Sequence, residues 1–183
     1  MQNEEKLIDG CCKGDRAMQE ELYRRYSKRM LVVCLRYSKA TEDAEDILQE
    51  AFIKVFQNIK KFRRDSSLGY WIKRIVINTA LNYQRGKLYL FPMVDIQELN
   101  HNVEKETILD RFHFKELLEM VQALPVGCQV IFNLYAIEGY PHKEIAKLLN
   151  VSEGTSKSQY ARARKLLQQM LQQSENVNYE KFQ

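Results

Sequence analysis

Apolar residues recur at steps of three and four along most of the first 87 residues, which is the spacing of one face of an α-helix. The stripe is clearest over residues 41–62, where nine apolar positions from Ala44 to Phe62 share a face. A second stripe predicts a helix over 15–38 with Asp15 as its N-cap, and a third predicts a helix from Tyr70 to Arg85. The N-terminal part is therefore expected to be a helical bundle.

The helix expected over 41–62 carries a second face whose residues are Asp46, Gln49, Glu50 and Ile53. Acidic residues crowd its first turns, an order that complements the helix dipole. A solvated polar face is the simplest interpretation. An apolar Ile53 beside acids, however, indicates a contact with another protein.

A basic loop precedes the third helix and reads "RRDSSLG" over 63–69. The helix is expected to bury Trp71, Ile75 and neighbouring apolar residues, and to expose the opposite face. That opposite face holds Lys73, Arg74, Asn78, Asn82 and Arg85. Aromatic rings beside cations suit single-stranded nucleic acid, whose bases stack while its phosphates pair with cations. The alternative is that Trp71 and Tyr83 belong to the core.

Residues 88–110 follow neither a helical nor a strand period, contain Pro92 and accumulate acids. They are predicted to be an acidic, flexible linker. It divides a domain at 1–87 from a second helical domain at 111–172, which is followed by a polar tail at 173–183. The fold class expected is all-α, with two helical domains.

The stretch from 141 to 167 reads "PHKEIAKLLNVSEGTSKSQYARARKLL" and predicts a helix-turn-helix. Ala146 suits the helix crossing, Asn150 suits a left-handed turn and Ser152 suits an N-cap. The start of the second helix would reach base edges in a major groove, and its later cations would hold phosphates. The exposed candidates, with the cap, are Ser152, Glu153, Gly154, Thr155, Lys157, Ser158 and Arg162.

Composition narrows the functional classes. The 183 residues carry a net charge of +4, distributed as +6 over 1–87, −4 over 88–120 and +2 over 121–183. Two basic segments favour a polyanionic partner. Four cysteines without zinc-ligand spacing indicate reduced thiols. Neither a signal peptide nor a membrane-spanning run is evident, so we expect a cytoplasmic protein. No catalytic, metal, cofactor or small-molecule signature occurs.

Three segments in this order resemble the extracytoplasmic-function (ECF) sigma factors of bacterial RNA polymerase. They are the helix from Asp43 to Phe62, the loop and helix from Phe62 to Arg85, and "LPVGCQVIFNLYAIEGYPHKEIAKLLNVSEGTSKSQYARARKLL" at 124–167. The resemblance implies a bacterial, non-enzymatic protein that binds core RNA polymerase and promoter DNA. It also implies control by an anti-sigma factor.

The resemblance also assigns residues. Asp46, Gln49 and Glu50 match the polymerase-docking segment, and the exposed Ile53 lies beside them. The minus-10 promoter element would be melted and held by Arg63, Arg64, Asp65, Ser66, Lys73, Arg74, Asn78 and Asn82. The helix-turn-helix would read the minus-35 element. Two positions depart from the family pattern: Ser156 replaces an apolar residue, and Gln159 replaces an Arg.

Three other interpretations compete. The helix-turn-helix alone would also allow an operator-binding transcriptional regulator, but residues 1–87 show no receiver or ligand-sensor pattern. An enzyme would need a signature that the chain lacks. An interaction scaffold would leave the basic recognition helix without a purpose.

Overall fold

The structure is a computed structural model that describes residues 2–85 and 111–180. Every regular element in these two ranges is helical, which confirms the all-α prediction. The chain divides into two compact units, residues 1–86 and 87–183. The predicted linker at 88–110 lies outside the described residues.

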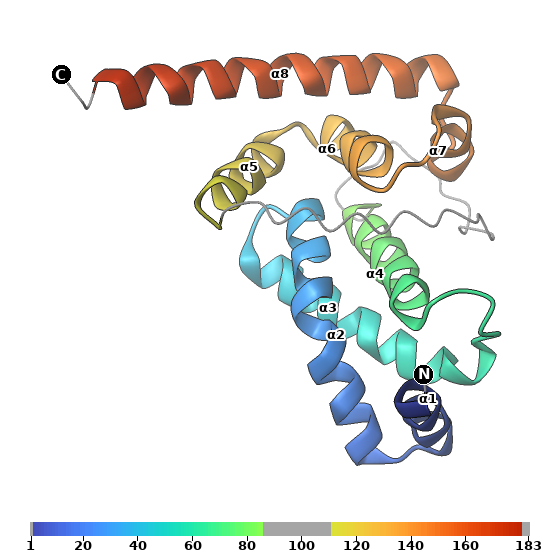
Figure 1. Cartoon of the computed structure of the whole chain (residues 1–183). Coiled ribbons are helices and arrows are strands. Elements are labelled where there is room, and N and C mark those ends of the chain that lie inside the picture. Colours follow the sequence, from blue (N-terminus) through green and yellow to red (C-terminus); the bar gives the residue numbers. More distant parts are fainter. Residues whose placement is uncertain (1, 86–110, 181–183) are drawn as a thin grey trace. The chain divides into compact units, whose positions relative to one another are not determined.

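The first unit is built on three helices that pack against one another: α2 (Arg16–Tyr37), α3 (Thr41–Asn58) and α4 (Leu68–Arg85) (Figure 1). The predicted cap of α2 is confirmed, because the Asp15 carboxylate accepts bonds from the amides of Ala17 and Met18. The predicted stripe of α3 is also confirmed, with Ile47, Phe52 and Val55 among its buried residues. Burial of such stripes is the main driving force for the bundle.

Two elements of this unit were not predicted. A first helix, α1 (Gln2–Lys13), packs on α2 and on the short 3-10 helix η1 (Ile59–Lys61). The α-helix expected to reach Phe62 thus ends at Asn58 and tightens into η1. The turn between α1 and α2 passes through Gly14, whose φ of +80° favours glycine.

Helix α4 corrects the expected division into one buried and one exposed face. Its buried residues include Ile72, Val76, Ile77 and Leu81, so they surround more than half of the helix. The cause is that α4 packs on both α2 and α3. Trp71 and Ile75 are only half-buried, and they share one stripe with Asn78 and Asn82 at steps of four, three and four. The asparagines therefore do not lie opposite Trp71.

The second unit contains α5 (Arg111–Ala123), α6 (Val126–Phe132), α7 (His142–Leu149) and α8 (Glu153–Glu180). Helix α6 continues as a π-helix, η2 (Asn133–Ile137). Helix α8 is drawn in Figure 1 as one continuous helix, and it passes residue 172 to end at Glu180. Leu124, Cys128 and Ala163 form a small core that joins α6 to α8.

Candidate nucleic-acid and protein interfaces

The outer face of α3 presents the four residues predicted to contact a protein. Asp46, Gln49, Glu50 and Ile53 are all exposed, and Ile53 keeps 52% of its surface in solvent. The Glu50 carboxylate lies 2.6 Å from Lys54 Nζ, so its charge is partly compensated in the free protein. The structure thus brings the four residues together on one helix surface.

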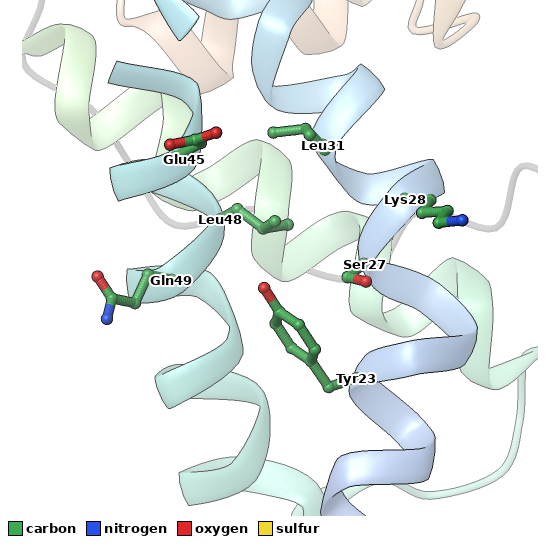
Figure 2. A pocket seen from close by; sticks show the side chains of 7 residues that line it. All are labelled: Tyr23, Ser27, Lys28, Leu31, Glu45, Leu48 and Gln49. Carbon is green, nitrogen blue, oxygen red and sulfur yellow. The ribbon is translucent and has the colours of Figure 1, made fainter. Parts of the chain in front are cut away.

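Next to this face, an open groove of about 370 Å³ lies between α2 and α3 (Figure 2). The side chains that line the groove are Tyr23, Ser27, Lys28 and Leu31 from α2 with Glu45, Leu48 and Gln49 from α3. The ring of Tyr23 lies edge-on to Phe52 at a centroid distance of 4.7 Å. Tyr23 is 43% exposed, although it lies in the helix predicted over 15–38 to present an apolar stripe to the core. Sequence reasoning therefore missed the contribution of α2 to this surface.

The loop before α4 displays Arg63, Arg64 and Asp65 at the surface, with Ser66 half-buried. Arg64 adopts a left-handed conformation (φ +63°) and its guanidinium lies 2.6 Å from the Asp9 carboxylate of α1. Left-handed backbone is uncommon for a non-glycine residue. The loop is therefore linked to the unpredicted helix α1.

Ser67 caps α4, whereas Asp65 and Ser66 stand before it in the loop. The Tyr70 amide donates to Ser67 Oγ at 3.3 Å, and the Trp71 amide donates to the Ser67 carbonyl oxygen. Ser67 is the residue directly before α4, which begins at Leu68. An aromatic pair stands at the same end, where the Phe62 and Trp71 rings are 5.3 Å apart.

The candidate nucleic-acid residues on α4 do not all share one side. Arg74, Asn78 and Asn82 fall on the less buried side with Trp71, since their spacing is that of a helical stripe. Lys73 lies about 140° around the helix from Asn78, on the side where the buried residues lie. Trp71, Asn78 and Asn82 thus form a single surface that continues from the loop.

The helix-turn-helix takes the predicted form. Asn150 ends α7 in a left-handed conformation (φ 50°, ψ 50°), and the Val151 amide donates to the Ala146 carbonyl. Ser152 Oγ accepts the Thr155 amide at 2.9 Å, which confirms it as the N-cap of α8. Helix α7 packs on α8, and the buried residues of α7 are Ile145, Ala146, Leu148 and Leu149.

The predicted DNA-contacting residues of α8 lie on the surface near its N-terminus. Glu153, Gly154, Lys157, Ser158 and Arg162 are exposed, and Thr155 is half-buried. Lys157 Nζ lies 2.7 Å from the Glu153 carboxylate, and this hydrogen bond and charge lower the pKa of Glu153. The Ser158 hydroxyl donates to the Thr155 carbonyl at 3.0 Å.

Both departures from the expected recognition-helix pattern have structural partners. Ser156 is fully buried, with Oγ 2.8 Å from Nδ1 of His142. Cys128 Sγ donates to Gln159 Oε1 at 3.0 Å, which ties α8 to α6. Burial raises the pKa of the Cys128 thiol and, together with Lys157, lowers the pKa of His142. His142 was not predicted, because no local pattern links residues 142 and 156.

The described helices and the described acidic, His and Cys side chains have two further properties. None of the helices in residues 2–85 and 111–180 combines the length and the apolar character needed to cross a bilayer. Over the same two ranges, no three His, Cys, Asp or Glu side chains gather closely enough to hold a metal ion.

Comparisons with known proteins follow the same division of the chain. The family described as "Sigma-70 region 2" matches residues 22–87, and "Sigma-70, region 4" matches residues 114–167. The ECF RNA polymerase sigma factor SigM of Mycobacterium tuberculosis is 29% identical, over 91% of this chain and 83% of its own. The ECF RNA polymerase sigma-E factor of Escherichia coli is 28% identical, over 91% of this chain and 93% of its own.

The solved structures include a protein with the same fold. It is the sigma factor RpoE of Bartonella quintana, crystallised with the anti-sigma factor NepR. The likeness has a TM-score of 0.52 at 18% identity, and it covers 84% of this chain and 96% of that one. At this identity the likeness concerns the fold alone.

Proposed function

Because this chain belongs to the ECF family of RNA polymerase sigma factors, which direct transcription initiation and are not enzymes, we propose how its two units divide that work. Residues 1–87 would dock on core polymerase and hold melted minus-10 DNA. Residues 111–172 would read the minus-35 element. Residues 88–110 would connect these two domains, and the part of α8 beyond residue 172 would extend past the minus-35 reader. The site of action would be the bacterial cytoplasm.

The observation that carries this proposal is the helix-turn-helix of the second unit. Its left-handed Asn150, its Ser152 cap and its buried α7–α8 contact set the start of α8 as an exposed recognition surface. In this architecture the N-terminal residues of the second helix contact base edges in the major groove. Glu153, Gly154 and Lys157 occupy those positions.

The polymerase contact is proposed to combine the outer face of α3 with the adjoining groove. Asp46 and Glu50 supply negative charge, and Ile53 and Tyr23 supply exposed apolar surface. Interfaces of this kind place aromatic and apolar groups at the centre and charges around them. The same surface is a candidate for an anti-sigma factor, which would then exclude polymerase by competition.

Charge reversal on α3 tests the docking role. We expect Asp46→Arg and Glu50→Lys each to weaken binding to purified core polymerase at least tenfold. A polymerase surface that pairs with acidic side chains is positively charged, so the introduced cation would be repelled by it. Both side chains are exposed, so the melting temperature should change little. Affinity is measured by fluorescence anisotropy of labelled protein titrated with core enzyme.

Glu5→Lys provides the matched control, since Glu5 is an exposed acid on α1 away from the α3 face. It makes the same change in net charge and should bind core polymerase normally. Unchanged binding by both α3 variants would exclude this face as the docking surface. Equal loss in the Glu5 variant would show that the effect is one of net charge.

A further inference from the structure

A hydroxyl group is buried in the recognition helix where an apolar side chain would be expected. Ser156 has no exposed surface and lies in the first turns of α8. Burying a hydroxyl without a hydrogen bond costs roughly 1–3 kcal/mol. Here the partner is Nδ1 of His142, at 2.8 Å. Because His142 is the first residue of α7, the bond joins the two helices of the helix-turn-helix.

The imidazole ring of His142 is itself held from a third element. It stacks on Tyr135 of η2, with ring centroids 4.1 Å apart and planes 10° apart. Tyr160 of α8 approaches both rings, at 4.5 Å from Tyr135 and 5.8 Å from His142. The stacking fixes the plane of the imidazole, so Nδ1 has a defined direction toward Ser156. The π-helical turn that supplies Tyr135 is a feature often found at functional sites.

The surroundings of the His142 ring favour its neutral form, and burial is the main cause. Burial and the nearby Lys157 lower the pKa of His142, while Glu153 on the same helix raises it. The other ionisable groups facing or adjoining the ring are the phenols of Tyr135 and Tyr160 and the side chains of Lys143 and Glu144. A neutral imidazole can either donate to the serine hydroxyl or accept from it.

We propose that His142 and Ser156 are a positioning pair that sets the rotation of the recognition helix, so that discrimination among minus-35 sequences depends on their hydrogen bond. This inference rests on the function proposed above. The residues that would meet DNA, from Glu153 to Ser158, surround Ser156 within two turns of a rigid helix. A hydrogen bond is directional, whereas an apolar contact at the same position would permit rotation.

An isosteric pair of substitutions separates positioning from packing. Ser156→Thr keeps the hydroxyl and Ser156→Val replaces it with a methyl group of the same shape. Holoenzyme made from the full chain and core polymerase is first offered promoter duplexes randomised over the minus-35 segment. The selected duplex and a scrambled duplex are then the probes, and the ratio of their affinities measures discrimination.

The positioning role predicts that Ser156→Thr keeps the wild-type ratio within about twofold. Ser156→Val and His142→Phe should each reduce it about fivefold, the effect of one lost hydrogen bond. The double variant, His142→Phe with Ser156→Val, should lose no more than either single variant, because both remove the same bond. Binding to scrambled duplex, which depends on phosphates, should stay constant.

Ser174→Ala is the matched control, since it removes a hydroxyl bonded to the Leu171 carbonyl further along α8. A Val variant that discriminates as well as the Thr variant would overturn the inference, even if its melting temperature changes. Additive losses in the double variant would overturn it as well. A wild-type holoenzyme that selects no minus-35 sequence would instead refute the proposed function, and this inference with it.

Discussion

At the scale of single residues, the helix-turn-helix depends on Asn150 and Ser152 in its turn and on the buried pair of His142 and Ser156. Asn150 and Ser152 were recognisable because a left-handed turn and an N-cap require particular residue types at fixed offsets. The partner of Ser156 was not recognisable, because His142 meets it only after α7 and α8 have packed together. The exposure of Tyr23 was missed for the same kind of reason, since its surroundings are decided by α3.

Gly154 is a residue that the protein's own fold does not require. A Cβ added there would meet only Ser152 Oγ, at an ordinary contact distance of 3.6 Å. Glycine within a helix costs roughly 0.5–1 kcal/mol relative to alanine. We infer that close approach of the DNA explains its presence. Gly154→Ala should therefore raise the free energy of unfolding slightly and weaken binding to minus-35 duplex about tenfold.

Chemical denaturation and anisotropy with labelled duplex measure the two effects of Gly154→Ala. Gly127→Ala is the matched control, because a Cβ on α6 would also find only ordinary contacts, with Gln159 at 3.8 Å. It should be stable and should bind normally. Normal DNA binding by the Gly154 variant would show that the helix N-terminus does not approach DNA closely.

At the scale of elements, periodicity predicted the existence of the main helices and was less reliable at their ends. The stripe of α3 was read correctly because one face of the helix packs on the core. The faces of α4 were misread because two helices cover it, and no single stripe describes such a helix. The π-helical turn after Phe132 was not predicted, because its five residues are too few to show a hydrophobic periodicity different from that of an α-helix.

The start of α4 yields a prediction that distinguishes capping from DNA binding. Ser67→Ala should lower the free energy of unfolding by about 1 kcal/mol, because the Tyr70 amide loses its partner. Asp65→Ala and Ser66→Ala should leave it within about 0.5 kcal/mol but reduce transcription from a promoter that requires melting. Urea unfolding and in vitro transcription on linear templates make the two measurements.

The three variants of the loop are matched, since each removes one small polar side chain within three consecutive positions. A large loss of stability in the Asp65 variant would show that Asp65 also stabilises the start of α4. Full transcription by both the Asp65 and the Ser66 variants would exclude these side chains from holding minus-10 DNA.

At the scale of the whole molecule, the distribution of charge matters more than its sum. A net charge of +4 is modest, yet the N-terminal 87 residues alone carry +6. Family membership and the division into two helical units were both predictable from the order of three segments. What the sequence could not supply was the contact of Arg64 with α1, because that helix lay outside every predicted pattern.

The dependence of promoter binding on salt follows from this distribution. Each phosphate contact releases counterions, so the slope of log affinity against log salt changes by about 0.9 per contact with duplex and by about 0.7 per contact with a single strand. Arg162, exposed on α8, and Arg63, exposed in the loop, are proposed to make one contact each, Arg162 with duplex and Arg63 with melted DNA. In the holoenzyme, Arg162→Gln should make the slope shallower by about 0.9 and Arg63→Gln by about 0.7. The double variant should lose about 1.6, because the two contacts belong to different units.

Lys115→Gln is the control, since Lys115 is an exposed cation on α5 that lies 3.9 Å from Glu119 and outside both proposed surfaces. Filter binding from low to physiological salt gives the slopes of the wild type and of the four variants. A slope that stays at the wild-type value in the double variant would remove both cations from the DNA interface, and an equal change in the Lys115 variant would attribute the effect to total charge.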